Sequence, residues 1–446
     1  MSGGIRLRRC GHKDTVVSRR HIVIIGGGFG GLACARALGN SEVDVTLIDR
    51  RNHNLFQPLL YQVATAALSP ADISEPIRRS LGRYRNIRVL MAEVVGVDSG
   101  AKHVRLADRG EVAYDQLVIA TGSQYNYFGH DDWQFHAPGL KSIHEARQIR
   151  QRLLLAFEKA ELAHTEREKQ SLLTSIVIGG GPTGVEMAGA ISELGRYMIS
   201  RDYRTLAPSQ MRVILLEAGP RILASFPGHL SSYAATYLKR IGVEIRLGQR
   251  VSAVGEGHVI VGEERIDAGC IIWGAGVKAS PAFAWLGMKE PPGGRIPVDA
   301  NLQVVGLSDI YAIGDTAMAL DPEGKPLPAL AQVAKQQGEF LGRKLRQGGP
   351  PAPFRFRNRG NTAVIGRHAA VFDFGRWTLK GRLAWLLWAI VHVYLLVNFE
   401  KRVLVTVQWI WRYLTRQRGA RIIDEDAALI GDQKDVTQII ALGRRR

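Results

Sequence analysis

The chain has 446 residues, 46% of them hydrophobic and 22% charged, which is enough for a sizeable core and about three structural units. Its 59 basic and 41 acidic residues give a net charge of +18, which is compatible with nucleic acid, an anionic membrane or no particular partner, and no nucleic-acid-binding module is recognisable. The cysteines Cys10, Cys34 and Cys270 form no C-x-x-C pair, which excludes a metal ribbon and a redox-active dithiol and fits a reducing cytoplasm.

Residues 1–20 form a basic, polar extension. They contain no apolar run of the length of a secretory signal, so we expect neither a signal peptide nor an ordered element there.

A phosphate-binding fingerprint follows this extension. Residues 22–31 read IVIIGGGFGG, an apolar run and then a G-x-G-x-x-G motif made by Gly26, Gly28 and Gly31. The first glycine allows a tight turn, the second lets a pyrophosphate approach the positive end of a helix, and the third lets that helix pack on the strand. The next apolar run ends at Asp49, whose carboxylate can accept hydrogen bonds from both ribose hydroxyls of an adenosine.

The same pattern recurs downstream. Residues 176–184 read IVIGGGPTG, with Gly179, Gly181 and Gly184 in the motif, and the following apolar run ends at Glu217. Two complete fingerprints predict two dinucleotides in one protein. The usual pair is a bound flavin and a diffusing nicotinamide, so the chain is predicted to be a flavin oxidoreductase.

Further apolar runs place the remaining strands. Residues 117–123 and 310–316 each end in a glycine turn and belong to the first unit, whereas residues 243–247 and 270–276 belong to the second. The chain is expected to return to the first unit near residues 295–299. The predicted fold is therefore α/β, with two Rossmann-like domains, the second inserted into the first.

The C-terminal part has a different composition. Residues 374–421 contain five of the eight tryptophans and nine Lys or Arg against one acid, a composition typical of a lipid–water interface. Residues 383–399 lack charge but are short for a membrane span, so a buried or in-plane helix is favoured. An amphipathic helix is predicted beyond them, with its apolar face either on a membrane surface or in a packing or dimer interface. That face consists of Val403, Val407, Ile410, Trp411 and Leu414.

These residues and several further segments resemble the type II NADH:quinone oxidoreductases, single-subunit respiratory flavoenzymes that do not pump protons. The further segments read NLFQPLLYQVA (residues 54–64), ATGS (120–123), IGDT (313–316) and AQVAKQ (331–336). The last of these matches the A-Q-x-A-x-Q element of the family in full. The resemblance covers about residues 20–420 and implies a pyridine nucleotide-disulfide oxidoreductase-like fold. It assigns residues 21–145 and 298–373 to an FAD-binding domain, 146–297 to an NADH-binding domain, and 374–446 to a C-terminal membrane-associating region and tail.

The resemblance implies that the first fingerprint holds FAD. Asp49 then binds the adenosine ribose, Asp315 bonds the ribityl or pyrophosphate region, and Gln57 lies in a loop along the isoalloxazine ring. Plainer alternatives are an Asx turn at Asp315 and a solvated loop at Gln57. The implied FAD residues are Gly26, Gly28, Gly30, Gly31, Asp49, Arg50, Gln57, Val94, Thr121, Gly122, Asp315 and Gln332.

The second fingerprint is implied to hold NADH. Glu217 disfavours NADPH because a carboxylate repels a 2′-phosphate, while the nearby Arg221 would weaken that preference. Glu186 is implied to lie near the nicotinamide and the flavin; otherwise it only complements the positive helix end. Trp273 could belong to this site or could equally be an aromatic residue of the core. The implied NADH residues are Gly179, Gly181, Thr183, Gly184, Glu186, Glu217 and Gly276.

A quinone site is implied by the A-Q-x-A-x-Q element. Gln332 and Gln336 share one helical face, and their amides can both donate to and accept from a quinone oxygen, although glutamine pairs are also common on helix surfaces. Lys380 is implied to support proton delivery and is otherwise an interfacial anchor. The implied catalytic residues are Glu186, Gln332, Gln336 and Lys380, with no metal.

The function implied is hydride transfer from NADH to FAD and transfer of two electrons to a membrane quinone. The protein is expected on the cytoplasmic face of the inner (plasma) membrane, attached peripherally to the bilayer, and a homodimer remains an option. Two rivals are an NADH-sensing flavoprotein that acts through a partner and a reductase of a small iron–sulfur protein. Disulfide reductases and sulfide:quinone reductases need cysteines that this chain does not supply.

Overall fold

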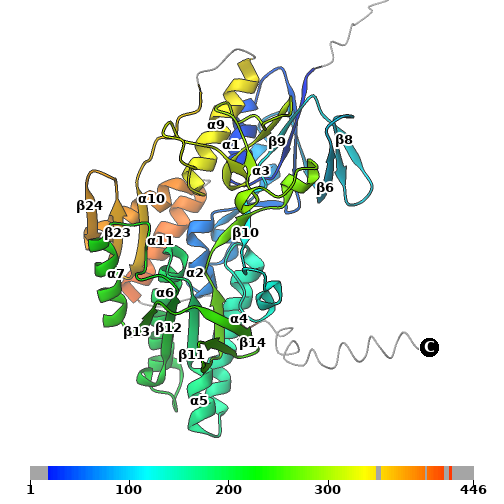
Figure 1. Cartoon of the computed structure of the whole chain (residues 1–446). Coiled ribbons are helices and arrows are strands. Elements are labelled where there is room, and N and C mark those ends of the chain that lie inside the picture. The colour runs from blue at the N-terminus through cyan, green and yellow to red at the C-terminus, as the bar shows by residue number, and fades with distance from the viewer. Residues whose placement is uncertain (1–18, 348–352, 397–398, 416–420, 424–446) are drawn as a thin grey trace, which may run out of the picture.

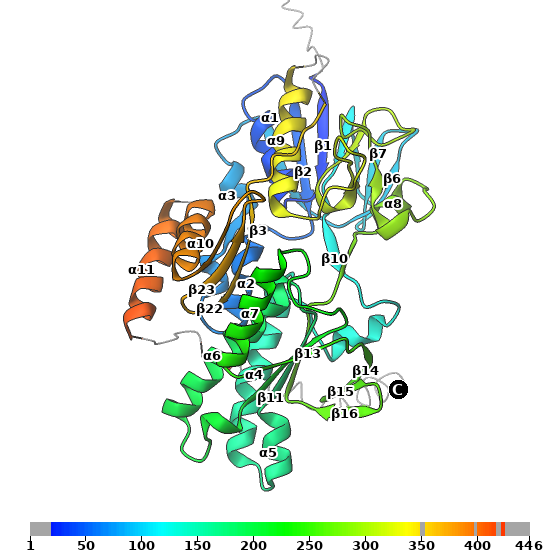
Figure 2. The same cartoon turned by 60° about the vertical axis from the view of Figure 1, so that its left-hand side comes forward.

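The computed structural model describes residues 19–347, 353–396, 399–415 and 421–423. Two α/β units lie one above the other, and a three-stranded sheet with helices α10 (Arg382–Leu395) and α11 (Phe399–Thr415) lies beside their junction (Figures 1 and 2). Nearly all of the expected N-terminal extension, Cys10 and the tail after residue 423 fall outside the described residues.

A five-stranded parallel sheet in the order β20-β9-β1-β2-β5 forms the core of the first unit. Its central strand reads HIVII, and Ile22, Val23 and Ile24 are fully buried, because a central parallel strand has no solvent face. Glycines bring α1 and α9 together: a Cβ on Gly338 would lie 2.1 Å from the carbonyl oxygen of Gly30. The elements are β1 (His21–Ile25), α1 (Phe29–Leu38), β2 (Asp44–Asp49), β5 (Ile87–Met91), β9 (Gln116–Ile119), β20 (Ile310–Ala312) and α9 (Ala331–Gln347).

Small elements surround this sheet. A hairpin-like pair of strands and two short helices follow β2, and an antiparallel sheet of three strands covers one side. They are β3 (His53–Leu55), α2 (Leu60–Ala64), β4 (Ser74–Pro76), α3 (Ile77–Leu81), β6 (Val94–Asp98), β7 (His103–Leu106), β8 (Glu111–Ala113), α8 (Ala282–Trp285), β19 (Ile296–Pro297) and β21 (Ala317–Met318).

The second unit repeats the parallel design with four strands in the order β13-β12-β11-β17. Its strand β11 reads TSIVI and is buried along its whole length. The elements are α4 (Ile143–Leu162), α5 (Glu166–Leu172), β11 (Thr174–Ile178), α6 (Pro182–Asp202), β12 (Arg212–Glu217), α7 (Gly228–Arg240), β13 (Val243–Leu247), β14 (Val251–Gly255), β15 (His258–Val261), β16 (Glu264–Asp267) and β17 (Cys270–Trp273).

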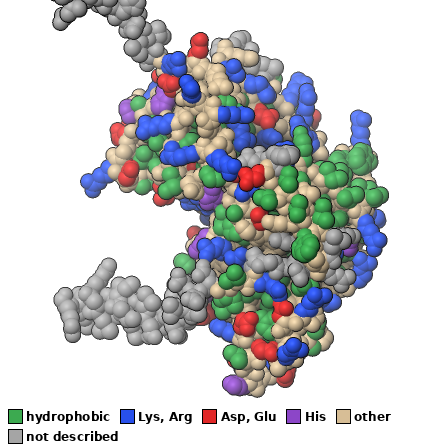
Figure 3. Space-filling view, turned by 180° about the vertical axis from the view of Figure 1, so that it is seen from behind, with side chains coloured by type: hydrophobic (Ala, Val, Ile, Leu, Met, Phe, Trp, Pro, Cys, Tyr) green, Lys and Arg blue, Asp and Glu red, His purple; other side chains and the backbone are tan. Residues whose placement is uncertain are grey.

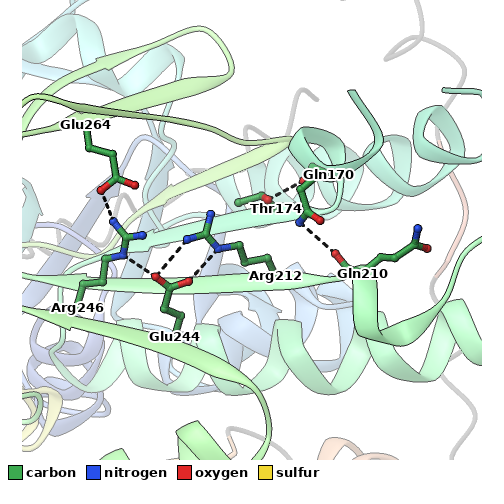
Figure 4. Close-up of polar contacts among 7 residues, drawn as sticks. All are labelled: Gln170, Thr174, Gln210, Arg212, Glu244, Arg246 and Glu264. Carbon is green, nitrogen blue, oxygen red and sulfur yellow. Dashed lines mark hydrogen bonds and ion pairs between the residues drawn. The ribbon is translucent and has the colours of Figure 1, made fainter. Parts of the chain in front are cut away.

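An ion-pair network joins the outer strands of the second unit (Figure 4). The Arg212 Nε lies 2.8 Å from Oε2 of Glu244, whose Oε1 lies 2.6 Å from the Nε of Arg246. The Nη1 of Arg246 reaches Glu264 at 2.7 Å. Exposed ion pairs contribute only about 0–1 kcal/mol each, so the network mainly fixes how β12, β13 and β16 lie relative to one another.

Two antiparallel strands carry the chain between the units. β10 (Ser123–Tyr125) pairs with β18 (Val277–Ala279). The second unit is therefore inserted into the first, as predicted. Ala282, just after β18, is already buried in the core of the first unit, so the chain returns before the predicted residues 295–299. The sequence signal near Ile296 is a short strand, β19, inside the first unit.

The third sheet consists of β22 (Asn361–Gly366), β23 (Ala369–Asp373) and β24 (Thr378–Gly381). It packs on α6 of the second unit, where a Cβ on Gly189 would lie 1.9 Å from the carbonyl oxygen of Ile365. The assumed domain boundary after residue 373 falls between two strands of this sheet. Residues 361–381 form one layer that rests on the second unit and supports α10.

The two C-terminal helices each bury one side and expose the other. The uncharged segment 383–399 is not one continuous helix, because α10 ends at Leu395. None of the described helices has the length and apolar composition needed to span a bilayer. Trp388 and Val405 are buried in the main core. The predicted helix over 403–414 is confirmed, and its predicted apolar face is turned outward: Val403, Val407, Ile410 and Trp411 are 46–60% exposed, while the Leu414 side chain lies outside the described residues.

Candidate active site

The first fingerprint forms a turn that only glycine fits. Gly26 has φ of 106°, and a Cβ there would lie 2.3 Å from the carbonyl oxygen of Ala120. A Cβ on Gly31 would lie 1.8 Å from the oxygen of Gly26, so this glycine lets α1 pack against the end of β1. At Gly28, in contrast, a Cβ would meet no protein atom within 4 Å. The helix N-terminus at Gly28 has no side-chain cap and no acid in its first turn, which leaves its N–H groups able to bind an anion.

The carboxylate of Asp49 is fixed at the end of β2. Its Oδ2 accepts a hydrogen bond from the N–H of Gly27 at 2.6 Å, and its Oδ1 accepts one from the N–H of Arg51 at 2.7 Å. The Asn54 side chain donates to the carbonyl oxygen of Gly27 at 2.8 Å. These bonds aim the carboxylate beside the phosphate-binding turn, where a ribose would lie. Arg50 follows as an exposed residue.

The second fingerprint repeats this geometry. Gly179 has φ of 107°, and a Cβ on Gly184 would lie 1.8 Å from the oxygen of Gly179. A Cβ on Gly181 would again meet nothing within 4 Å, and α6 begins there without a side-chain cap. Glu217 accepts from the N–H of Gly180 at 2.5 Å through Oε2 and from Gly219 at 2.6 Å through Oε1.

The guanidinium of Arg221 is held away from the Glu217 carboxylate by its own loop. Its Nη1 donates to the oxygen of Phe226 at 2.7 Å, and its Nη2 donates to the oxygen of Ala224 at 2.6 Å. Two carbonyls therefore satisfy this cation, which limits its ability to offset the negative charge of Glu217.

Hydroxyl groups gather where the two units meet, between the charged side chains of Lys141 and Asp315. Ser123 donates to Oδ2 of Asp315 at 2.6 Å and accepts from the Lys141 ammonium at 2.7 Å. Burial lowers the pKa of Lys141, and the charge of Asp315 opposes that shift. Thr121 lies 2.9 Å from the hydroxyl of Thr316. The Asp315 carboxylate is therefore held by side chains from distant parts of the chain. A plain Asx turn would give it only local backbone contacts. Gly122, Gln57 and Gly314 border the same region: Gly122 has φ of 70°, Gln57 donates to the oxygen of Lys141, and Gly314 donates to the buried Gln337.

A groove of about 1380 Å³ opens between the second unit and the C-terminal helices. We refer to it as the α6–α10 groove. Figure 3 shows hydrophobic side chains gathered over the right-hand part of the molecule, with Lys and Arg side chains around them. The groove is lined by Tyr61, Gln62 and Thr65 beside α2, by Glu186, Ala190 and Glu193 of α6, by Val364 of β22, and by Trp385, Trp388, Ile390, Trp409 and Ile410 of α10 and α11.

Glu186 is the titratable group with the clearest perturbation at this groove. Burial raises the pKa of its carboxyl to about 8, and the single hydrogen bond from Val364 N–H, at 3.4 Å, opposes the shift only weakly. The carboxyl is therefore mostly protonated at neutral pH. A buried acid with a pKa near the working pH is suited to hold or release a proton.

Aromatic side chains of α10 and α11 line the groove and contact α2. His392 stacks on Trp388 with ring centroids 4.3 Å apart, and its Nδ1 lies 2.8 Å from the carbonyl oxygen of Trp388. Burial lowers the pKa of His392 to about 4, so the ring is neutral. Trp409 donates to Oε1 of Gln62 at 3.1 Å, and Gln62 donates to the hydroxyl of Tyr61. These hydrogen bonds hold α11 against α2. The sequence motifs do not identify Tyr61, Gln62 and Trp409 as groove residues, although Tyr61 and Gln62 lie in the segment 54–64.

Gln332 and Gln336 lie on one face of α9, but both amides are engaged with backbone. Gln332 donates to the oxygen of Gly360 at 3.1 Å and accepts from the N–H of Arg359 at 3.1 Å. Gln336 donates to the oxygen of Arg357 at 2.9 Å and accepts from its N–H at 3.0 Å. The two side chains hold residues 357–360 along α9 and are not part of the groove lining.

Six other residues considered from the sequence do not line the groove. Lys380 is exposed on β24, with its ammonium 5.6 Å from the ring centroid of Tyr233, and does not line the groove. Trp273 is a core aromatic, 2% exposed and stacked on Tyr127. Val94 is buried in the first unit, and Gly30 lies under α9. Gly276 lies beside the Phe128 ring, and Thr183 follows Pro182 in the first turn of α6.

The two thiols in the described part of the chain are unsuited to redox chemistry. Cys34 and Cys270 are buried and unpaired, and burial raises the pKa of each to about 12. Both are therefore protonated at neutral pH and weak nucleophiles.

Comparisons with known proteins identify the family of the chain. Residues 20–338 match the model of the pyridine nucleotide-disulphide oxidoreductase family, and residues 358–418 match the model of the NDH2 C-terminal domain. The type II NADH:quinone oxidoreductase NdhA of Mycobacterium tuberculosis is 38% identical over 433 residues, which cover 93% of this chain and 91% of that protein. The chain belongs to the type II NADH:quinone oxidoreductase family.

More distant members share the fold. An internal alternative NAD(P)H-ubiquinone oxidoreductase of Arabidopsis thaliana mitochondria is 30% identical, with 90% of this chain and 85% of that protein covered. The solved structure of Plasmodium falciparum NDH2 in complex with NADH superimposes with a TM-score of 0.82 at 23% identity, covering 91% of this chain and 100% of the other. The family membership explains why the C-terminal sheet and helices accompany the two nucleotide-binding units.

Proposed function

We propose that this chain oxidises NADH and reduces a membrane quinone through a bound FAD, at a site formed by the two fingerprints and the α6–α10 groove. Membership of the type II NADH:quinone oxidoreductase family supports the reaction. FAD would take up a hydride from NADH and return two electrons to the quinone, which binds two protons to become quinol. The protein contributes binding, orientation and proton placement.

The first fingerprint fits the FAD pyrophosphate. The open position at Gly28, the uncapped N-terminus of α1 and the fixed Asp49 carboxylate match the phosphate and ribose of an adenine dinucleotide. Asp315, held by Ser123, would face the ribityl or pyrophosphate part. Gln57 would line the flavin ring, with Thr121 and Gly122 near the flavin mononucleotide half.

The second fingerprint fits NADH. Glu217 would accept both ribose hydroxyls, and a 2′-phosphate would be repelled by its charge. Arg221 is bound to two carbonyls, which supports a preference for NADH. Gly276 and Thr183 would complete this site.

The groove would admit the quinone from the membrane side. Its walls are largely apolar and aromatic, and Glu186 lines it together with Tyr61 and Gln62. We assign to Glu186 the role of holding a proton that the reduced quinone needs. The amides of Gln332 and Gln336 remain candidates for quinone recognition; each would have to exchange a backbone hydrogen bond for one to the quinone.

The exposed apolar faces of α10 and α11 would rest on the bilayer. Leu383, Leu386 and Ile390 on α10 are 52–70% exposed, and the outer face of α11 continues the apolar surface. Patches of this kind mark membrane or protein interaction sites. We place the protein peripherally on the cytoplasmic face of the inner membrane, where NADH is available.

The observation that carries this proposal is the pair of matched dinucleotide fingerprints next to an apolar groove lined by Glu186, a partly buried acid whose pKa is raised by burial. The deciding experiment is the absorption spectrum of the purified protein. The flavin bands should bleach with NADH and return with a soluble quinone. A protein that is reduced by NADH but reoxidised only by an iron–sulfur protein would assign it to a different electron acceptor.

A further inference from the structure

The outer part of the α6–α10 groove carries a cluster of positive side chains. Arg367 and His368 lie in the turn between β22 and β23, and Arg382 is the first residue of α10. All three line the groove. The pKa of His368 is lowered by burial first and then by the charges of Arg367 and Arg382, so the three groups lie close enough to interact electrostatically. Cations gathered in this way are stabilised when an anion lies among them.

The groove as a whole is lined by more positive than negative side chains, as the cluster is. Among the described residues that line it, five are arginines and two, Glu186 and Glu193, are acidic. Glu193 accepts a hydrogen bond from the N–H of Arg367. Glu186 is mostly protonated at neutral pH because its pKa is about 8. A quinone is neutral, so the arginines are not explained by quinone binding.

An apolar wall adjoins this cluster on α10. Leu383, Leu386, Ile390 and Tyr394 follow helical spacing, are 52–70% exposed, and line the same groove. Trp385 of the same helix contacts the cluster, because its ring centroid lies 5.6 Å from that of His368. A ligand that fits both surfaces must be an amphiphile with an anionic head and an apolar chain.

The groove is large enough for such a ligand in addition to a quinone head. One face of α6 lines it from Glu186 through Ala190, Glu193 and Tyr197 to Arg201. These positions span about 22 Å at 1.5 Å per residue. The volume of about 1380 Å³ also exceeds the roughly 300–1,000 Å³ of an ordinary small-molecule site.

We propose that the outer part of the groove binds one anionic phospholipid, with its phosphate at Arg367, His368 and Arg382 and its acyl chains along the exposed face of α10. Guanidinium groups bind phosphate oxygens through paired hydrogen bonds, and the N-terminal end of α10 carries a favourable partial positive charge. The inference rests on the proposed membrane-facing surface. It adds a lipid site that is separate from the groove end occupied by Glu186.

The test is lipid retention measured by native mass spectrometry on the full chain. The protein is equilibrated in detergent with equal amounts of phosphatidylglycerol and phosphatidylcholine, and the bound lipids are counted. Wild type should retain one phosphatidylglycerol per chain in preference to phosphatidylcholine. Arg367→Gln with Arg382→Gln should weaken this retention about thirtyfold. The matched control is Arg85→Gln with Arg88→Gln, two exposed arginines of the first unit, which should retain the lipid as wild type does.

A second measurement uses the wild-type chain alone. Phosphatidylglycerol with a photoreactive acyl chain should label residues 383–394 of α10. The site would be overturned if wild type retained phosphatidylglycerol and phosphatidylcholine equally, or if the two double variants retained phosphatidylglycerol equally. Photolabelling confined to segments outside α10 would also overturn it. If Arg367→Gln with Arg382→Gln changed the oligomeric state of the protein and left lipid retention unchanged, the lipid site would be overturned. The surface would then be assigned to contact with a second copy of the chain.

The same samples separate this inference from the proposed function. Bleaching of the flavin by NADH and its return with quinone test the reaction, and neither requires the lipid site. Loss of the reaction with normal lipid retention would contradict only the proposed function. A normal reaction without selective retention would contradict only the lipid site.

Discussion

The carboxyl oxygen Oε1 of Glu186 accepts a hydrogen bond from the backbone N–H of Val364 at 3.4 Å. This contact joins helix α6 of the second unit to strand β22 of the C-terminal sheet, two segments separated by almost 180 positions in sequence. It places a buried acid where the nicotinamide-binding unit meets the groove that leads to the membrane-facing helices. In the proposed function, a proton held here would serve the quinone in the groove.

The first prediction concerns Glu186→Gln and its pH dependence. The folded pKa of about 8 lies above the ordinary value of 4.5, so the folded state binds the proton more tightly than the unfolded state. The stability contributed by this group is fully present below about pH 4.5 and is lost as the pH rises through about 8. Thermal melts should therefore show the wild type losing stability relative to the glutamine variant between these values.

The same substitution should affect the quinone half-reaction. Glutamine cannot donate a proton, so reoxidation of the flavin by quinone should slow by at least about tenfold at pH 7, while reduction by NADH is spared. Glu290→Gln, which changes an exposed acid, is the matched control. Slower NADH reduction with normal quinone reoxidation would place Glu186 on the nicotinamide side alone.

The second prediction is that the purified protein is yellow with non-covalent FAD and that Asp49→Ala reduces its flavin content. The substitution removes the acceptor for two backbone N–H groups, Gly27 and Arg51, and the proposed ribose contact. Acid precipitation should release the flavin from wild type, and its amount can be read from the absorption spectrum. Asp44→Asn, at the exposed start of the same strand, should keep a full complement of flavin. A colourless folded wild type would contradict the assignment.

The third prediction concerns nucleotide choice. Wild type should prefer NADH to NADPH by at least about tenfold in kcat/KM, equivalent to about 1.4 kcal/mol. Glu217→Gln removes the charge that repels a 2′-phosphate and should narrow that ratio by at least about threefold. Steady-state kinetics with both nucleotides measures the effect. Equal use by the wild type would mean that another cation offsets Glu217, because Arg221 is bound to carbonyl oxygens.

Local spacing was sufficient to predict the two glycine turns and the carboxylate beside each of them. In each motif the positions of the glycines determine the turn and the helix start, so Gly26 and Gly179 adopt the same φ and Asp49 and Glu217 make the same pair of backbone contacts. The outer face of α11 was predictable for the same reason, since helical periodicity is a property of neighbouring residues.

Long-range packing was not predictable in this way. The groove depends on α6, β22 and α10 meeting, and no spacing in the sequence encodes their contact. The position of Lys380 on the exposed side of β24 follows from the pairing of Lys380 with Val371 across the sheet. Likewise the amides of Gln332 and Gln336 meet the backbone of residues 357–360 only in the folded chain.

The fourth prediction is that Gln332→Leu with Gln336→Leu impairs quinone reduction and spares flavin reduction by NADH. The substitutions remove four hydrogen bonds to residues 357–360, so the melting temperature should fall as well. Stopped-flow traces of the two half-reactions provide the measurement. If NADH-dependent bleaching is slowed and quinone reoxidation is normal, the glutamines do not serve the quinone.

The last prediction concerns membrane attachment. Truncation before Phe374 would remove strand β24 and the buried Trp388 and Val405, and so would damage the core. Substitution of the exposed face is the cleaner test. Val403→Glu with Val407→Glu places two charges on side chains that are 46% and 59% exposed and do not line the groove, so folding and the groove should be retained. Each apolar side chain contributes about 25 cal/mol per Å² of buried area, and a charge at the same position is costly in a bilayer.

This double variant should leave the membrane fraction with its FAD content and NADH reduction unchanged. Val95→Glu with Val305→Glu is the matched control, because these valines are 53% and 59% exposed on the first unit. High salt should release wild type only partly, since salt screens the arginines and lysines but not the apolar contact, whereas detergent should release it fully. If the α11 variant still pelleted with membranes and the control did too, the anchor would lie elsewhere and the outer face of α11 would serve packing between copies of the chain.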